Sequence, residues 1–367
     1  MKVLITGAHF TPAVATIEEL KKIGGLEVVY VGRRTTQEGD TVQSVESKVL
    51  PTLGVKFIPI IPGRLQRAFT IHTIPSLLKI PIGLLQAFFI VLSEKPDVIL
   101  SFGGYVAVPI VMIGWLFSIP VIIHEQALVP GLANRISSVF ADKIAISFDG
   151  SAFKGEKVVL TGNPIRRIVG KISQNISRKR SGLPTILVMG GNQGSHVINL
   201  AVEKCLDRLL KIALVYHQTG DSQYRDFERL EELWKLGSLG VSGEKYIVKK
   251  WIGQEYGTIL QKADLVVSRS GINTLTELAF LGKPALLIPI SNKEQNRNAK
   301  FFEELGFTRV LPQSKLSAET LLKNIVSMLK DLDYLKERAK ESKKIIIPDA
   351  AKKLVLETIL LGEKIEI

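Results

Sequence analysis

The sequence is dominated by short, continuous apolar segments that alternate with segments of helical periodicity. The apolar segments are KVLIT, EVVYVG, VKFIPI, DVILSF, PVIIHE, KIAISF and KVVLTG, followed by TILVMG, LVYHQTG, KYIVKKWI, DLVVSRS and PALLIPI. Continuous Val/Ile/Leu runs are typical of parallel strands that are covered by helices on both faces. The pattern therefore predicts an α/β fold built on parallel sheets.

The alternation starts afresh at Thr185. From there TILVMGGNQGSHVINLAVEKCL repeats the strand, glycine turn and helix of KVLITGAHFTPAVATIEEL. A chain of 367 residues is also longer than one hydrophobic core usually serves. We therefore predict two Rossmann-like domains. The first comprises residues 1–163, with a helix at residues 349–367 packing back on it, and the second comprises residues 164–348.

The charge and cysteine content restrict the class of partner. A net charge of +13 indicates an acidic partner, such as nucleic acid, an anionic membrane or a phosphorylated substrate, unless it is only a solvated basic surface. No nucleic-acid-binding module or aromatic–basic pattern is present, which argues against nucleic acid. The single cysteine, Cys205, excludes a disulfide within the chain and fits a reducing compartment.

Two apolar stretches resemble membrane spans in length but are interrupted. TIPSLLKIPIGLLQAFFIVLSEK contains Pro75, Lys79 and Pro81, and DVILSFGGYVAVPIVMIGWLFSIPVIIHEQ contains two adjacent glycines and two prolines. A span needs about 20 uninterrupted apolar residues. We therefore interpret the second stretch as a strand, a glycine turn, a buried helix and a strand.

Glycine turns follow several of the predicted strands. TGAHFTP places Gly7 and His9 after the first strand, SFGGYVAVP places Gly103 and Gly104 after the fourth, and GGNQGS (Gly190 to Ser195) follows TILVM. Ligands of such folds bind at the carboxyl ends of the strands. None of these turns is a G-x-G-x-x-G fingerprint, which weighs against a dehydrogenase. No metal-binding signature, Walker A motif or G-x-S-x-G motif occurs, so no tightly bound cofactor or metal is expected.

The richest polar stretch is ADLVVSRSGINTLTELAFLGKPALLIPISNKEQNRNAKFFEELG. A strand ends at Ser268, Ser270 and Gly271 form the turn, and a helix is predicted to begin near Thr274. The free N–H groups of its first turn suit an anion. Thr274-x-x-Glu277 matches a capping box, and Glu277 alternatively binds ribose hydroxyls.

HEQALVPGLANR places His124, Glu125 and Gln126 just beyond the predicted strand PVII. Without further context a buried, hydrogen-bonded histidine is commoner than a functional one, so both interpretations of His124 stay open.

A set of longer motifs extends across nearly the whole chain. In order, they are FGGYVAVP, IPVIIHEQ with GLANR, TGNPIR, GGNQGS, HQTG and SRSGINTLTELAFLGKPALLIPI with QNRNA. In this set of motifs the chain resembles the MurG-like glycosyltransferases of family 28. The resemblance implies a GT-B fold, in which the parallel sheets of two Rossmann-like domains face each other across an inter-domain cleft. It also implies transfer of GlcNAc from UDP-GlcNAc to the C4 hydroxyl of MurNAc-pentapeptide on diphosphoundecaprenol, with inversion.

The resemblance also implies a donor site. Glu277 would hold the ribose, Gln295 the GlcNAc hydroxyls, Trp251 and Ile252 the uracil, and Arg166 the diphosphate. The remaining donor members are the helix-start residues Ser270, Gly271, Ile272, Asn273 and Thr274, the loop residues Asn192, Gln193 and Gly194, and Asn298. The family usually has serine where this chain has Asn192.

On the acceptor side the resemblance makes His9 the candidate catalytic base. The other implied acceptor residues are Gly7, Gly103, Gly104, Tyr105, His124, Glu125 and Gln126. Two departures fall in this half. The family's first loop reads GGTGGH where this chain has TGAH, and Ala127 replaces an asparagine after HEQ. A loop with fewer free backbone N–H groups should form a weaker diphosphate cradle.

GRLQRAFTIHTIPSLLKIPIGLLQAFFIV corresponds to the membrane-contact region of the family. An apolar patch with a basic rim binds anionic lipid, whereas core packing of a Rossmann helix would explain the same apolar residues. The implied membrane residues are Arg64, Arg67, Phe69, Ile74, Leu77, Leu78 and Lys79. We therefore expect a cytoplasmic protein that is peripheral on the inner face of the cell membrane, with UDP-GlcNAc and a polyprenyl-diphosphate-linked sugar as partners.

Three alternative functions stay open. A related glycosyltransferase would use a UDP-sugar with a different lipid-linked acceptor, as the short first loop and Ala127 suggest. A sugar-nucleotide epimerase would consume UDP-GlcNAc without an acceptor, but needs additional acid/base carboxylates that the motifs do not supply. A non-catalytic membrane module would bind the UDP-sugar only as a ligand.

Overall fold

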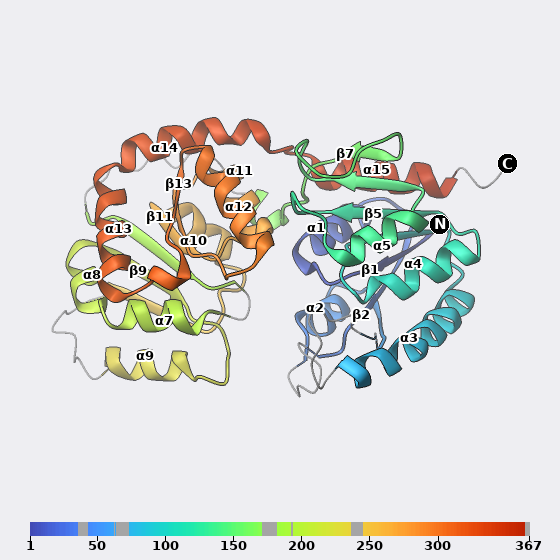
Figure 1. The fold of residues 1–367 in the computed structure, drawn as a ribbon, viewed down its shortest axis with the longest axis horizontal. Coiled ribbons are helices and arrows are strands. Elements are labelled where there is room, and N and C mark those ends of the chain that lie inside the picture. Colours follow the sequence, from blue (N-terminus) through green and yellow to red (C-terminus); the bar gives the residue numbers. More distant parts are fainter. Residues whose placement is uncertain are drawn as a thin grey trace. The chain divides into compact units, whose positions relative to one another are not determined.

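The computed structural model describes residues 1–35, 43–61, 63, 73–170, 182–191, 194–235 and 245–363, without the side chains of residues 73–78. These residues form two compact units (Figure 1). Unit 1 comprises Met1–Arg166 and Ile347–Ile367, and unit 2 comprises Arg167–Ile346.

Unit 1 is built on a seven-stranded sheet in which every strand pair is parallel. The strands, in their order across the sheet, are β3 (Lys56–Pro59), β2 (Glu27–Gly32), β1 (Lys2–Thr6), β4 (Val98–Ser101), β5 (Val121–Glu125), β6 (Lys143–Ile146) and β7 (Val158–Leu160). From β1 the strand order runs outward in one direction through β2 and β3 and in the other through β4 to β7. In this type of sheet, ligands bind where the order reverses, which here is at the carboxyl ends of β1 and β4.

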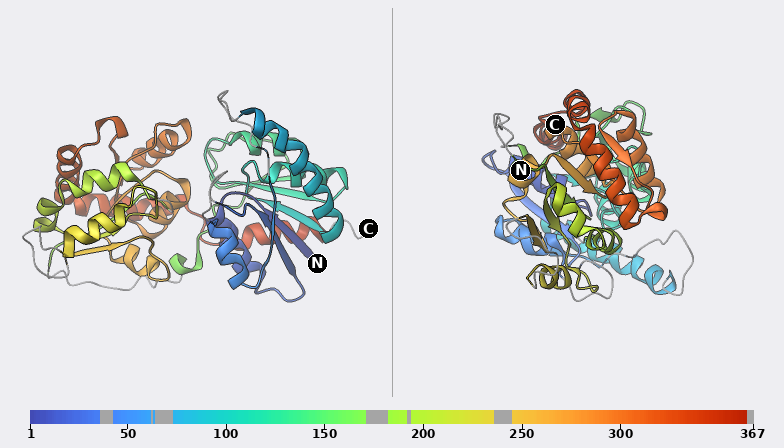
Figure 2. Two further views of the ribbon diagram at one scale, coloured as in Figure 1. Left: turned by 90° about the horizontal axis from the view of Figure 1, so that it is seen from below. Right: turned by 90° about the vertical axis from the view of Figure 1, so that its left-hand side faces the viewer.

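Helices cover both faces of this sheet, as Figures 1 and 2 show from different directions. One core cluster joins β1 and β4 to α1, α2 and α15, and a second joins the same sheet to α3 and α4. The helices are α1 (Phe10–Leu20), α2 (Val45–Thr52), α3 (Thr73–Glu94), α4 (Ala107–Leu116), α5 (Leu132–Phe140) and α15 (Ala350–Glu363). The C-terminal helix α15 buries Leu354, Val355 and Leu361 in the first cluster.

Unit 2 repeats the plan with a six-stranded parallel sheet. Its strands, in order, are β10 (Tyr246–Lys249), β9 (Leu214–Gln218), β8 (Thr185–Met189), β11 (Leu265–Ser268), β12 (Ala285–Leu287) and β13 (Thr308–Val310). The helices are α6 (Arg167–Gly170), α7 (His196–Glu203), α8 (Leu206–Ile212), α9 (Asp226–Lys235), α10 (Tyr256–Lys262), α11 (Ile272–Leu281), α12 (Lys293–Glu304), α13 (Ala318–Lys330) and α14 (Leu332–Glu341), with short 3-10 turns at Gln313–Lys315 and Ser342–Ile345.

The predicted α/β fold with two parallel sheets is confirmed, and each predicted strand segment contains an observed strand. The sequence reading missed β13, which is only three residues long and contains the polar Arg309. Its pairing with β12, not its composition, makes it a strand.

The second apolar stretch forms β4, a turn, α4 and β5, as predicted, and most of the first forms α3. Within the part of the chain that the structure describes, no helix combines the length and the apolarity needed to cross a bilayer.

Candidate active site

In unit 2 the strand β11 leads through Arg269, Ser270 and Gly271 into α11, which begins at Ile272. The predicted capping box is wrong, because Thr274 lies inside the first turn and Gly271 is the N-cap residue. Glycine has no side chain with which to cap the helix, so the N-cap residue provides no side-chain acceptor for the N–H groups of the first turn. Such a helix start suits an anion.

Ser270 joins this helix start to α12. Its hydroxyl donates to the backbone oxygen of Gln295 at 2.8 Å, and its own carbonyl accepts from Asn298 Nδ2 at 3.2 Å. The Gln295 carboxamide oxygen also accepts from the Ile290 N–H at 3.1 Å. The structure therefore brings together three predicted donor residues from two separate motifs, at the carboxyl end of the sheet.

Glu277 lies one helical turn further along α11 and its side chain is buried. The Tyr256 hydroxyl, at the start of α10, donates to Glu277 Oε2 at 2.9 Å. This bond fixes the carboxylate relative to the sheet. Sequence reasoning missed Tyr256, because its partner lies on another helix and no local pattern links them.

The loop after β8 is held by a carboxamide from β9. Gln218 Nε2 donates to the Gly191 carbonyl at 3.0 Å, while its Oε1 accepts from the Ile252 N–H at 2.9 Å. Gln218 therefore ties the glycine turn to the predicted uracil pair, in which Trp251 is half exposed and Ile252 is buried.

Two of the predicted donor residues, Asn192 and Gln193, lie outside the described residues. Gly194 is described and has a φ of +76°.

Arg269 links the two glycine turns of unit 2, although sequence reasoning assigned it no role. Its guanidinium donates to the Ser195 hydroxyl at 2.7 Å and to the Ile288 carbonyl at 2.9 Å. Burial lowers the pKa of Arg269 below its ordinary value. The available signal was an arginine that follows the apolar run LVV at the end of a predicted strand.

We expect Gly194→Ala to destabilise unit 2 more than Gly191→Ala. Both glycines have positive φ, which costs an L-residue about 1–2 kcal/mol. A Cβ at Gly194 would also lie 1.8 Å from the Thr219 carbonyl oxygen, whereas one at Gly191 would meet no described heavy atom within 4 Å. The overlap should cost about 1–3 kcal/mol more. Thermal unfolding of the two variants tests this, and equal losses would contradict it.

Arg166 is the last residue of unit 1, so its place in the donor site stays a prediction. Across the described residues, no three His, Cys, Asp or Glu side chains lie together as metal ligands would.

In unit 1 the predicted acceptor turns meet at the carboxyl ends of β1 and β4. The Ala8 N–H donates to the Gly103 carbonyl at 2.9 Å, which joins the turn at Gly7 to the Gly103–Gly104 turn. Gly103 has a φ of +74°, and a Cβ there would lie 2.5 Å from Asn134 Oδ1. The close approach of Asn134, from the GLANR motif, therefore requires glycine at this position.

His9 lies between β1 and α1, at the N-cap position of the helix. Its side chain makes no capping hydrogen bond, and the residue is half-buried. Burial lowers the pKa of His9 to about 4. The imidazole is therefore neutral at physiological pH and has a lone pair with which to accept a proton.

The strand β5 extends to Glu125, so His124 and Glu125 lie within the strand and not beyond it, contrary to the sequence-based prediction. The His124 ring is fully buried, with Nε2 2.9 Å from the Gly162 carbonyl and Nδ1 3.1 Å from Gln126 Nε2. Burial lowers its pKa to about 4. Both ring nitrogens thus have hydrogen-bond partners, which fits the interpretation of His124 as a buried, hydrogen-bonded histidine.

The two residues after His124 are also engaged within unit 1. Glu125 accepts from the Ala127 N–H and from Asn134 Nδ2, both at 2.8 Å. Gln126 is fully buried and donates to the Phe102 carbonyl at 3.3 Å. Both side chains thus form hydrogen bonds within unit 1, and contact with an acceptor stays a prediction for both.

Tyr105, which follows the glycine turn, pairs with a residue that sequence reasoning missed. Arg33 Nη1 donates to the Tyr105 hydroxyl at 3.0 Å, and the guanidinium lies over the ring, 5.4 Å from its centroid. Arg33 directly follows β2, so its position beside β1 could not be inferred without the strand order.

The predicted membrane residues fall largely outside the described part of the chain. Arg64, Arg67 and Phe69 are not described, and neither are the side chains of Ile74, Leu77 and Leu78 in α3. Lys79, also in α3, is half-buried.

Known protein families match both units. Residues 6–146 match the family model "Glycosyltransferase family 28 N-terminal domain", and residues 185–354 match "Glycosyltransferase family 28 C-terminal domain".

Two curated relatives carry the same name, UDP-N-acetylglucosamine--N-acetylmuramyl-(pentapeptide) pyrophosphoryl-undecaprenol N-acetylglucosamine transferase. The relative from Clostridium kluyveri is 35% identical over 96% of this chain and 98% of its own length. The relative from Legionella pneumophila is 33% identical over 95% of this chain and 93% of its own length.

Among solved structures, Acinetobacter baumannii MurG is similar, with a TM-score of 0.72 at 24% identity, over 98% of this chain and 99% of that chain. This likeness confirms the predicted GT-B type of fold.

Proposed function

Because the chain belongs to glycosyltransferase family 28, we propose that it transfers GlcNAc from UDP-GlcNAc to the C4 hydroxyl of MurNAc-pentapeptide on diphosphoundecaprenol, inverting the anomeric centre. The relatives named above supply the substrates in this proposal. The observation that carries it is the joining of Ser270, Gln295 and Asn298 at the uncapped start of α11.

The donor diphosphate would bind at the N-terminus of α11. The first-turn N–H groups of Ile272, Asn273 and Thr274 carry partial positive charge and need no metal to hold an anion. Departing UDP gains negative charge as the glycosidic bond breaks, so the same groups stabilise the transition state more than the ground state. Arg166 would add a full positive charge.

The nucleoside and the sugar would be recognised on either side of this diphosphate. Glu277, held by Tyr256, would accept hydrogen bonds from the ribose hydroxyls, and Trp251 and Ile252 would flank the uracil. Gln295 would bind the GlcNAc hydroxyls from α12, where its carboxamide is already held close to the helix start by Ser270 and Ile290.

His9 would act as the base that deprotonates the attacking hydroxyl. It lies at the carboxyl end of β1, among the glycine turns assigned to the acceptor, and its lowered pKa keeps it unprotonated. The hydroxyl oxygen attacks the anomeric carbon from the face opposite UDP, its proton passes to the imidazole, and UDP leaves with the bonding electrons.

We expect kcat/KM for the acceptor to be constant from about pH 8 to about pH 5 and to fall toward pH 4. His9 must be unprotonated to act, and its pKa is lowered to about 4, so protonation removes the base only below this value. A pH–rate profile tests this, with circular dichroism at each pH to exclude unfolding. An acid limb at the ordinary histidine pKa of 6.5 would contradict it.

Peripheral contact with the inner face of the cell membrane, from the cytoplasm, is the second part of the proposal. Exposed apolar side chains gather on α3 and at the end of α4, which pack together through Phe88 and Phe117. They include Ile82, Leu85, Phe89, Leu92, Trp115 and Leu116. The chain also carries a net charge of +13, and each basic residue near an anionic surface contributes about 1 kcal/mol. Co-sedimentation should therefore rise with the anionic lipid content of vesicles, and no rise would contradict this contact.

An acceptor panel tests the proposed reaction against a related transfer to another lipid. With UDP-GlcNAc as the common donor, we expect transfer to MurNAc-pentapeptide polyprenyl diphosphate and little to other diphosphate-linked sugars. Transfer only to a different sugar would favour the alternative that the short TGAH loop and Ala127 suggest. Consumption of UDP-GlcNAc without any acceptor would instead indicate an epimerase.

A further inference from the structure

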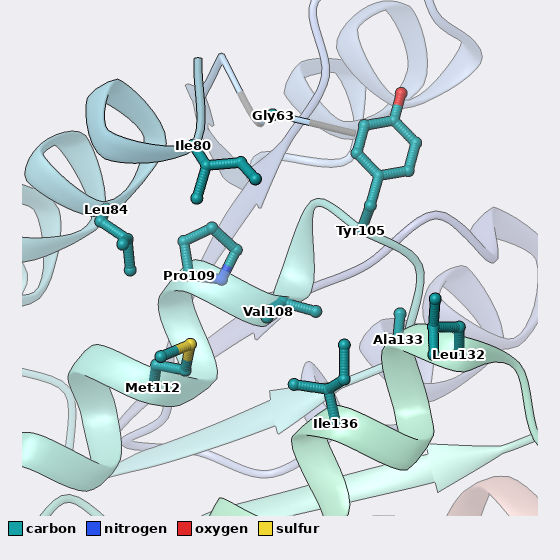
Figure 3. Close-up of a pocket in the computed structure, with 10 residues that line it drawn as sticks. All are labelled: Gly63, Ile80, Leu84, Tyr105, Val108, Pro109, Met112, Leu132, Ala133 and Ile136. Atoms are coloured by element: carbon teal, nitrogen blue, oxygen red, sulfur yellow. The ribbon is translucent and has the colours of Figure 1, made fainter. Parts of the chain in front are cut away.

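Unit 1 contains an apolar cavity of ≈ 230 Å³ between α3, α4 and α5 (Figure 3). It is distinct from the outward-facing apolar patch on α3 and α4, because its lining side chains point toward one another. Leu132 at its edge is 44% exposed, so the cavity is open to the surface. The walls are formed mainly by Ile80, Leu84, Val108, Met112, Ala133 and Ile136.

The lining determines what kind of molecule the cavity can hold. The Tyr105 hydroxyl is the polar side-chain group of the described lining, and Figure 3 shows it directed away from the aliphatic side chains. A sugar or a nucleotide would leave its polar groups unpaired there. A dry apolar cavity of about 150 Å³ binds benzene, so this cavity has room for roughly nine carbon atoms of hydrocarbon.

Polar groups near the cavity indicate what kind of hydrocarbon chain it binds. Tyr105 directly follows the Gly103–Gly104 turn, and its hydroxyl accepts from Arg33 at 3.0 Å. Ala133 directly precedes Asn134, whose side chain packs against Gly103. Next to Tyr105 and Ala133, just outside the cavity lining, thus lie a guanidinium and a glycine turn, which suit a diphosphate, whereas the remaining described lining is apolar.

We propose that this cavity binds the first two isoprene units of the acceptor's polyprenyl chain, with Arg33 contacting the diphosphate to which the chain is attached. The assignment rests on the proposed function and adds a binding site for the chain to it.

Two water-soluble acceptors test the assignment in the absence of membrane. Both carry MurNAc-pentapeptide diphosphate, one esterified to a ten-carbon prenyl chain and the other to methyl. We expect the KM for the prenyl acceptor to be at least tenfold lower. Ala133→Phe fills the cavity and should abolish this difference by raising the KM for the prenyl acceptor to that for the methyl acceptor. Val139→Phe, on the same helix at a position that is 73% exposed, should preserve it.

Further variants keep the test decisive. Leu84→Trp fills the cavity from the opposite wall and replaces Ala133→Phe if that variant does not fold. Arg33→Met should raise the KM for both acceptors, because both contain the diphosphate. Equal KM values in the wild-type enzyme, or a chain preference that survives both filling variants, would overturn the cavity assignment alone. Transfer to neither acceptor would overturn the proposed function and the assignment with it.

Discussion

Replacement of His9 by alanine is expected to lower kcat by about 10²–10⁴-fold, the usual contribution of a positioned general base. The imidazole lies at the carboxyl end of β1 beside the glycine turns, half-buried and without a capping hydrogen bond of its own. Burial lowers its pKa to about 4, which makes it a comparatively weak base at neutral pH. We therefore expect a loss near the lower end of this range.

Single-turnover measurements at saturating substrates would isolate the chemical step of this variant. The affinity for UDP-GlcNAc should be unchanged, because His9 belongs to unit 1 and the donor residues that the structure brings together belong to unit 2. The unfolding temperature serves as the control for folding. Near-wild-type turnover by folded protein would exclude His9 as the base.

Replacement of Glu277 by alanine is expected to weaken UDP binding by roughly 10- to 150-fold, since a hydrogen bond to a charged group contributes about 1.5–3 kcal/mol. The carboxylate is buried on α11 and receives a hydrogen bond from Tyr256 at 2.9 Å. It is therefore already oriented before the nucleotide arrives, and little ordering cost offsets its contact with the ribose. Titration calorimetry with UDP measures the loss directly.

Two further variants separate ribose binding from packing. Glu277→Gln keeps the volume and one acceptor oxygen, so its affinity should lie between those of the wild type and Glu277→Ala. Tyr256→Phe removes the orienting hydrogen bond but keeps the carboxylate, so it should weaken UDP binding less than Glu277→Ala does. UDP affinity that is unchanged in Glu277→Ala would remove this residue from the donor site.

The sequence was sufficient to predict the strands, because buried parallel strands are continuous apolar runs that few other elements imitate. It failed where pairing or local capping decides the structure. β13 contains Arg309 and is held by β12, and α11 begins at Ile272, after an N-cap residue, Gly271, that has no side chain to cap the helix. Thr274 and Glu277 match a capping pattern by spacing alone.

The candidate site was predicted only as far as short motifs describe it. Ser270 and Gln295 could be identified from their motifs, but the bond between them depends on α12 returning to the sheet beside α11. Tyr256, Gln218 and Arg33 act through partners that are distant in sequence, so no local pattern indicates their roles. Tertiary structure was needed to find them.

The measurement that tests the central claim most directly is the structure of the sugar product formed from UDP-GlcNAc and MurNAc-pentapeptide polyprenyl diphosphate. NMR of the isolated product gives both the linkage position and the anomeric configuration. The proposed mechanism predicts a GlcNAc in β-linkage to the C4 oxygen of MurNAc, with one UDP released for each sugar transferred. An α-linkage, attachment at another hydroxyl, or release of UDP without transfer would contradict it.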